Sequence, residues 1–279
     1  MVKVDRMLSA ITVSLVPEAR QGPFVFHSGL EDACKHAAEL GFDAIEIFPP
    51  DATAIDQAYV TSLLSTHGLK CAAVGTGAGW LCRQLTLVAG ESHVRQQAVE
   101  FIRNIIDVAG HLGAPAIIGS MQGRAAQAGE RVATLELLGK AVAELANYAA
   151  KRYAVPLLVE PLNRYETNLL NEVGETAAWI QTLPTDNVRV LADLFHMNIE
   201  EVDMPAALTA AGSYLGHVHF ADSNRRAVGL GHSPIADAVR ALREMNYQGY
   251  LSAEIFPRPD SDQAARQTIS SFRQLTGES

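Results

Sequence analysis

The sequence predicts an α/β protein built as a single (β/α)8 barrel, and three observations lead to this prediction. Short apolar runs typical of strands alternate with helix-like segments eight times along 279 residues, which is the pattern and the length that this fold needs. Glycines follow several expected helices, at Gly41, Gly68 and Gly113, where a left-handed residue closes a helix. No internal repeat, linker or low-complexity tract interrupts the pattern, so we expect residues 1–279 to form one domain.

Each expected unit consists of a strand followed by a helix. The strands are predicted at residues 8–14, 44–48, 70–74, 116–119, 156–160, 189–193, 216–220 and 250–256. The helices are predicted at about residues 30–40, 54–67, 92–112, 130–152, 172–182, 199–211, 234–246 and 261–275. Within residues 92–112, apolar side chains recur near the 3.6-residue period that gives a helix one buried face.

An open, doubly wound sheet is the alternative architecture for the same alternation. It is disfavoured because the Gly-x-Gly-x-x-Gly fingerprint of dinucleotide-binding sheets is missing after the first strand. The glycine-rich residues 75–79 follow the third strand and open no obvious helix. We interpret them as a flexible loop at the mouth of the barrel.

Composition and charge disfavour several classes of protein. The sequence is 48% hydrophobic, which is ample for a core, and it has no run of 18 apolar residues that would span a membrane. A net charge of −9 disfavours a nucleic-acid surface, which needs basic residues to meet phosphates. Residues 1–6 lack the apolar core of a signal peptide, and Cys34, Cys71 and Cys82 fit reduced thiols. We expect a soluble, cytoplasmic protein.

Potential metal ligands stand at the ends of the last four expected strands. These residues are Glu160, Asp193, His219 and Glu254, and each is about one strand–helix unit away from the next. In a barrel, the C-terminal strand ends form one mouth, and adjacent strands lie ~5 Å apart, so the four side chains can converge on one ion. Crowded carboxylates repel one another, and a divalent cation removes this repulsion. Each residue alone has an ordinary explanation, such as a helix N-cap for Asp193, but their consecutive placement favours a metal site.

Oxygen ligands with one imidazole indicate which metal to expect. They suit Mn²⁺ first, with Mg²⁺ or Co²⁺ as alternatives, whereas a structural zinc site favours thiolates. We therefore expect one such divalent ion per chain. His217 shares a strand face with His219, and we interpret it as a core or supporting histidine rather than a ligand.

Three more polar residues, Glu166, His196 and Arg225, follow shortly after these strand ends. We expect all three in loops above the metal, where an acid, a neutral histidine and a cation suit a polyhydroxy substrate with a polarised carbonyl. We also expect truncation of Arg225 to leave no buried cavity. A surface salt bridge is the alternative interpretation of Arg225.

Four segments, at residues 159–168, 193–201, 216–219 with 224–225, and 253–255, resemble the sugar isomerase and epimerase superfamily with the xylose-isomerase-like TIM barrel. Within it, they are most similar to the D-tagatose/D-psicose (allulose) 3-epimerases. The resemblance implies metal binding by Glu160, Asp193, His219 and Glu254, and substrate contacts by Glu166, His196 and Arg225. It also implies a homodimer or a homotetramer.

The activity that this resemblance implies is metal-dependent 3-epimerisation of a ketose or keto-sugar acid. Glu160 and Glu254 come from strands on either side of the sixth and seventh, so they can flank the substrate. They are the expected acid/base pair for proton abstraction α to a carbonyl through a cis-enediolate. The sequence departs from the epimerase pattern at residues 220–223 and 227–229. The segment that begins at His217 is equally similar to relatives acting on keto-sugar acids or inositol-derived ketones, which leaves the substrate open.

Other activities stay open for this sequence. An aldose–ketose isomerase, such as hydroxypyruvate isomerase, shares the enediolate, and an inosose dehydratase begins similarly but loses water. A DNA-repair AP endonuclease needs further metal ligands and a basic face, which the charge of −9 opposes. A non-catalytic binding barrel explains the fold but not the flanking glutamates. The glycine-rich residues 229–231 lack a helix N-terminus with a basic partner, so a phosphorylated substrate is disfavoured.

Overall fold

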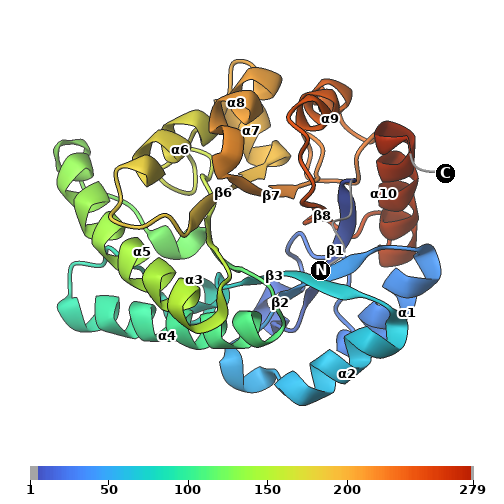
Figure 1. Cartoon of the computed structure of the whole chain (residues 1–279), viewed down its shortest axis with the longest axis horizontal. Helices are drawn as coiled ribbons and strands as arrows, with labels where there is room; N and C mark the ends of the chain where they lie inside the picture. The colour runs from blue at the N-terminus through green and yellow to red at the C-terminus, as the bar shows by residue number, and fades with distance from the viewer. Residues whose placement is uncertain (1–5, 278–279) are drawn as a thin grey trace.

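Eight parallel strands close into a barrel in chain order in the computed structural model, which describes residues 6–277 (Figure 1). The strands are β1 Leu8–Ser14, β2 Ala44–Phe48, β3 Lys70–Gly75, β4 Ala116–Ile118, β5 Leu157–Val159, β6 Val188–Asp193, β7 Leu215–His219 and β8 Tyr250–Ala253. The ring closes where β1 pairs with β8, with Leu8 opposite Tyr250 and Ile11 opposite Ala253. The predicted (β/α)8 barrel is confirmed. Residues 1–5, which entered the signal-peptide argument, lie outside the described part.

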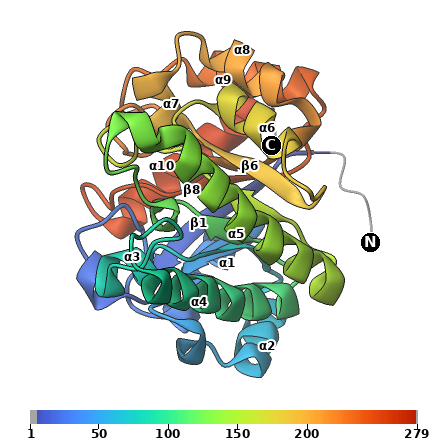
Figure 2. The same cartoon turned by 90° about the vertical axis from the view of Figure 1, so that its left-hand side faces the viewer.

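Helices surround the barrel on its outer side (Figures 1 and 2). They are α1 Leu30–Leu40, α2 Gln57–His67, α3 Ala78–Arg83, α4 Ser92–His111, α5 Arg131–Tyr153, α6 Val173–Gln181, α7 Leu194–Glu200, α8 Met204–Ala211, α9 Ile235–Glu244 and α10 Ser261–Thr276. The two longest, α4 and α5, pack side by side (Figure 2). The stripe predicted for α4 is buried, including Phe101, Ile102 and Ile105. Within residues 6–277, none of the helices combines the length and the apolar character of a membrane span.

Two helices differ from the sequence prediction. The glycine-rich residues 75–79 run from the end of β3 into α3, which begins at Ala78, instead of forming a flexible loop, and close packing explains a glycine within them. A Cβ at Gly79 would lie only 2.6 Å from Sδ of Met121. The helix predicted at residues 199–211 is observed as α8, which begins only at Met204 after its cap Asp203, while the unpredicted α7 begins directly after β6, where Asp193 caps it with a hydrogen bond from the Phe195 N–H at 2.8 Å.

Strand β5 is shorter than predicted, and its end still fixes the first site residue. The strand starts after Pro156, which has no N–H to give to the sheet. Beyond the last strand residue, the N–H of Glu160 donates to the carbonyl of Ile118 at 3.0 Å. The backbone of Glu160 is therefore held at the sheet edge, where the chain turns at Pro161.

Alternate side chains point into the barrel and form layers along its axis. One layer is apolar and contains Ala73, Ile117, Leu158 and Leu191. Glu160 and Asp193 follow Leu158 and Leu191 by two residues, so their side chains also point into the barrel. The barrel therefore places acidic groups directly above an apolar layer, at the mouth formed by the C-terminal strand ends.

Candidate metal centre and active site

Four side chains from consecutive strand ends converge at the mouth of the barrel. Glu160, Asp193, His219 and Glu254 each offer one ligand atom, and these atoms lie within 4.8 Å of one another. Nδ1 of His219 lies 3.5 Å from Oε1 of Glu160, 3.6 Å from Oδ2 of Asp193 and 3.7 Å from Oε2 of Glu254. The structure thus brings together the four residues predicted as ligands, while metal binding itself stays a prediction.

Unpaired polar atoms mark the point of convergence. Within residues 6–277, Oε1 of Glu160, Oδ2 of Asp193 and Nδ1 of His219 are buried without a hydrogen-bond partner. Buried polar groups without partners are costly, so such a cluster needs a ligand to satisfy it. Carboxylate oxygens with one imidazole nitrogen are suitable donors for Mn²⁺ or Mg²⁺. The donor set and the unpaired atoms fit a divalent cation.

Asp193 performs two tasks with its two oxygens. Oδ1 accepts the capping hydrogen bond from the Phe195 N–H, and Oδ2 faces the other three side chains. The capping role and the metal-site role were alternative explanations of this residue from sequence. The structure shows that they are compatible, because the start of α7 fixes the carboxylate while one oxygen stays directed into the site.

Burial and crowding shift the pKa values at this centre. Burial raises the pKa of Glu160 to about 7, and the neighbouring carboxylates add to the shift although His219 opposes it. Burial would lower the pKa of His219, but the surrounding carboxylates outweigh burial and raise it well above its usual value. Burial would raise the pKa of Asp193, but Arg225 and the two nearby histidines hold it well below its usual range. The cluster has a surplus of negative charge, which favours binding of a cation.

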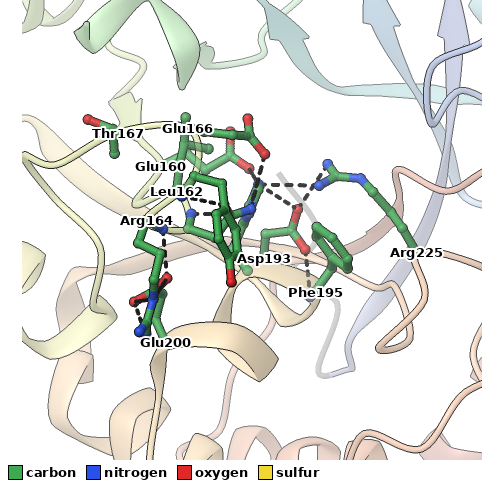
Figure 3. Close-up of polar contacts among 12 residues, drawn as sticks. Glu160, Leu162, Arg164, Glu166, Thr167, Asp193, Phe195, Glu200 and Arg225 are labelled. Atoms are coloured by element: carbon green, nitrogen blue, oxygen red, sulfur yellow. Dashed lines mark hydrogen bonds and ion pairs between the residues drawn. The ribbon is translucent and has the colours of Figure 1, made fainter. Parts of the chain in front are cut away.

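Arg225 lies in the loop after β7, as predicted, but it is buried, so the expectation that its truncation leaves no buried cavity and the surface salt-bridge alternative are both wrong. Its guanidinium contacts the carboxylate of Glu254. It also lies 3.1 Å from Oδ2 of Asp193 (Figure 3). Its Cζ lies 4.8 Å from the ring centroid of Phe195. The turn after β7 causes this inward direction: Arg225 has φ 55°, and its N–H donates to the carbonyl of Asp222 at 2.8 Å.

His196 is also placed differently from the prediction, because it lies on α7 rather than in a loop. Since arginine only donates, Nε2 of His196 accepts a hydrogen bond from Nη1 of Arg225 at 3.2 Å. The same nitrogen lies 3.9 Å from Oε1 of Glu160. Burial lowers the pKa of His196 to about 3, so the imidazole is neutral at pH 7, as expected from the sequence.

Glu166 lies in the loop at the rim of the site, as predicted. Its side chain is 47% exposed, and Oε1 lies 3.9 Å from Nδ1 of His196 and accepts a hydrogen bond from Nδ2 of Asn163 at 3.1 Å. Arg164 turns the other way and pairs with Glu200 at 2.9 Å (Figure 3). The loop after β5 therefore directs its acid toward the site and its arginine away from it.

A cavity of about 510 Å³ lies over these residues. Its polar lining includes Glu160, Glu166, His196, His219, Arg225 and Glu254. Its apolar wall includes Phe24, Phe48, Trp80, Phe195 and Phe256. A cavity with mostly apolar walls and a few convergent polar groups is typical of a small-molecule site.

Sequence reasoning missed Glu46, a buried residue in the middle of β2. Its Oε2 lies 2.8 Å from Nε2 of His217, and its Oε1 lies 3.1 Å from Nε2 of His219. A single acid between Ile45 and Ile47, in a strand with the inward–outward alternation of a barrel, was the available signal. His217 lies behind His219, where we expected a core or supporting histidine.

Sequence reasoning also missed Asp222, which organises the loop after β7. Its carboxylate accepts hydrogen bonds from the N–H groups of Ser223 at 2.8 Å, Gly229 at 2.9 Å and Ser233 at 3.1 Å. A Cβ at Gly231 would lie 2.2 Å from Oδ1 of Asp222. The glycines at residues 229–231 therefore allow the loop to wrap around a carboxylate, which disfavours a phosphate there.

Comparison with known proteins assigns this barrel to a family. The xylose isomerase-like TIM barrel family matches residues 34–275. The chain belongs to this family. An L-ribulose 3-epimerase from Methylomonas sp. is 30% identical over 252 residues, which are 89% of this chain and 86% of that protein. A D-psicose 3-epimerase from Agrobacterium fabrum is 41% identical over 107 residues, 38% of this chain and 37% of that protein.

A solved member of the family has the same architecture. The crystal structure of a D-allulose 3-epimerase from Methylomonas sp. in complex with D-allulose aligns with a TM-score of 0.82 and 26% identity over 99% of both chains. The resemblance predicted from the motifs is confirmed. The prediction of an isomerase-class enzyme is confirmed at the level of these relatives, which are named as epimerases.

Proposed function

We propose that this chain is a divalent-metal-dependent 3-epimerase of ketoses or keto-sugar acids. The observation that carries the proposal is the position of Glu160 and Glu254, which enter one cavity from β5 and β8 with Asp193 and His219 between them. Inversion at a carbon needs an acid and a base on opposite faces of the substrate, and this pair can supply both. The similarity to named 3-epimerases supports the same reaction.

The proposed metal ligands are Glu160, Asp193, His219 and Glu254, with one ion per chain and Mn²⁺ as the first choice. When bound, a divalent cation at this position supplies Lewis-acid polarisation of the substrate carbonyl. Mg²⁺ and Co²⁺ are the alternatives. Metal content after purification, measured by elemental analysis, tests the stoichiometry and the identity of the ion together.

The residues of the chain then carry out the proton transfers. One of the two glutamates removes the proton α to the carbonyl, and the other returns a proton to the opposite face. The enediolate formed between these steps carries negative charge on oxygen, which the buried guanidinium of Arg225 stabilises. His196 accepts a hydrogen bond from Arg225 and so holds the guanidinium in place. Glu166 accepts a hydrogen bond from a substrate hydroxyl at the rim.

Isotope exchange in D₂O with saturating Mn²⁺ tests the two-glutamate mechanism. The wild-type enzyme places solvent deuterium at the inverted carbon. Glu160→Gln and Glu254→Gln each lose net inversion, while each retains exchange on the face that its remaining glutamate serves. Both residues are also proposed ligands, so metal occupancy of each variant is measured first. If both variants epimerise at near-normal rates once loaded with metal, the mechanism is wrong.

Controls and products separate the proposal from its alternatives. Glu144→Gln is a matched control, because this acid is 56% exposed and pairs with Arg103 on the outer helices. It should keep both exchange and inversion. Identification of the products from a panel of ketoses, keto-acids and inosose distinguishes epimerisation from aldose–ketose isomerisation and from dehydration. Aldoses as the only products would show that the chain is an aldose–ketose isomerase. Dehydrated ketones as the only products would show that it is a dehydratase.

A further inference from the structure

The two ring nitrogens of His219 face two different acidic groups. Nδ1 faces the candidate metal centre, where it is buried without a hydrogen-bond partner among the described residues. Nε2 lies 3.1 Å from Oε1 of Glu46, and the other oxygen of Glu46 lies 2.8 Å from Nε2 of His217. All three side chains are buried inside the barrel. Glu46 thus contacts two imidazoles, one with each oxygen, beneath the metal centre.

The chemistry of these groups fixes where the hydrogens lie. Both oxygens of Glu46 lie within hydrogen-bond distance of an imidazole nitrogen, one 2.8 Å from Nε2 of His217 and the other 3.1 Å from Nε2 of His219. A carboxylate that meets a ring nitrogen with each oxygen accepts from both, so both histidines donate from Nε2. When an ion takes the place of a proton at Nδ1, His219 keeps its proton on Nε2 and directs the Nδ1 lone pair toward the three carboxylates, which is the form that a metal ligand needs.

A second metal site at Glu46, His217 and His219 is the competing interpretation, because their ligand atoms also lie close together. The hydrogen bonds argue against it. Within residues 6–277, the unpaired buried atoms include Nδ1 of His219 but neither oxygen of Glu46 and neither Nε2 atom. The atoms that need an ion lie on one side of His219 only. The other side is already satisfied by a carboxylate.

We propose that Glu46 is a positioning residue that fixes the orientation and the tautomer of His219, and that His217 anchors Glu46 by binding its second oxygen. This inference rests on the proposed metal centre. A carboxylate on the far nitrogen of a histidine ligand prevents rotation of the ring and raises its basicity, which strengthens metal binding. Glu46 comes from β2 and His219 from β7, so the support reaches across the interior of the barrel.

The Glu46→Gln variant tests this role with little change in volume. Its amide has one acceptor oxygen and one donor nitrogen, so it no longer accepts from both histidines. We expect the Kd for Mn²⁺, measured by calorimetry, to rise by about 10–100-fold. The Mn²⁺ concentration needed for half-maximal activity should rise by a similar factor, with kcat recovering at saturating Mn²⁺.

Asp43→Asn is the matched control. Asp43 directly precedes β2 at the opposite end of the barrel, where its Oδ2 accepts hydrogen bonds from the N–H and the hydroxyl of Ser9 at 2.8 and 2.9 Å. This variant should lower the melting temperature without changing the Kd for Mn²⁺. A change in Kd as large as that of Glu46→Gln would mean that lost barrel stability, and not positioning, explains the effect.

Nitrogen NMR of the wild-type enzyme loaded with diamagnetic Zn²⁺ gives a readout that needs no Glu46 variant. We expect His219 to carry its proton on Nε2, assigned by loss of the signal in His219→Gln. A proton on Nδ1 overturns the proposal, and so does a folded Glu46→Gln protein with a Kd within twofold of the wild type. If the wild type binds no Mn²⁺, the proposed metal centre fails and this inference falls with it.

Discussion

Replacing Arg225 with alanine removes a cation that lies among buried carboxylates. The guanidinium contacts Glu254, lies 3.1 Å from Oδ2 of Asp193 and covers the ring of Phe195, and its side chain is only 10% exposed. Breaking a buried ion pair from one side costs about 3–5 kcal/mol, because the remaining charge stays buried without compensation. We take the lower end, about 3 kcal/mol, because Arg225 lines the cavity and is therefore not enclosed on all sides. In a domain of this size, that loss lowers the Tm by roughly 6–12 °C.

The assay compares thermal unfolding of Arg225→Ala with the wild type in EDTA and again in saturating Mn²⁺. In EDTA, the full difference in Tm should be visible. In Mn²⁺, the difference in Tm between the variant and the wild type should become smaller, because the added ion neutralises the same carboxylates and stabilises the folded state of both proteins. Alanine and arginine both carry a Cβ, so the left-handed backbone of residue 225 adds no difference of its own. We expect kcat/KM at saturating Mn²⁺ to fall by about 100-fold.

Arg226→Ala is the control, since Arg226 is the next residue of the same loop and is only partly buried. Its Tm should stay close to that of the wild type. Equal melting of the two alanine variants in EDTA would show that the buried ion pairs contribute no net stability. If the Tm difference between Arg225→Ala and the wild type is as large in Mn²⁺ as in EDTA, the proposed ion does not bind at these carboxylates.

Two further predictions concern the same centre. A Cβ at Gly119 would lie 2.5 Å from Oε2 of Glu160, so Gly119→Ala should displace this carboxylate and lower kcat by about 10–100-fold. Gly90→Ala, where the added Cβ meets nothing within 4 Å, should leave kcat unchanged. Equal kcat values for the two variants would show that a Cβ at residue 119 does not disturb the carboxylate of Glu160. Chelation should abolish epimerisation and lower the Tm, and Mn²⁺ at about 100 times its Kd should restore both, with about 2.7 kcal/mol of stabilisation. Full activity in a metal-free preparation would contradict the proposed centre.

The barrel could be predicted because its repeat depends on local patterns. Strands β1 and β2 begin and end where the sequence predicts, since each is an apolar run with a clear boundary. The four candidate ligands could be predicted for a related reason. All parallel strands of a barrel end at the same mouth, so a position at a strand end is also a position in space.

The burial of Arg225 and His196 depends on geometry that the sequence does not show directly. Arg225 is directed inward by one left-handed turn residue, and His196 is brought over the site by a helix that starts immediately after β6. The role of Glu46 was still harder to predict, because its partners His217 and His219 lie 171 and 173 residues away in the chain. Strand alternation indicates that Glu46 points inward, but only the closed barrel shows which strand it faces.

The charges of the centre explain why a divalent ion fits it. Glu160, Asp193 and Glu254 bring three carboxylates together, and the guanidinium of Arg225 compensates one of them. A divalent ion supplies the remaining two positive charges, whereas a monovalent ion leaves one carboxylate uncompensated in a buried site. Glu46 carries a further negative charge, but each of its two oxygens already lies within hydrogen-bond distance of a histidine Nε2, at 2.8 and 3.1 Å. Oε1 of Glu160, Oδ2 of Asp193 and Nδ1 of His219, which are buried without a hydrogen-bond partner, lie together on the Nδ1 side of His219, and this is the side on which we propose that the metal binds.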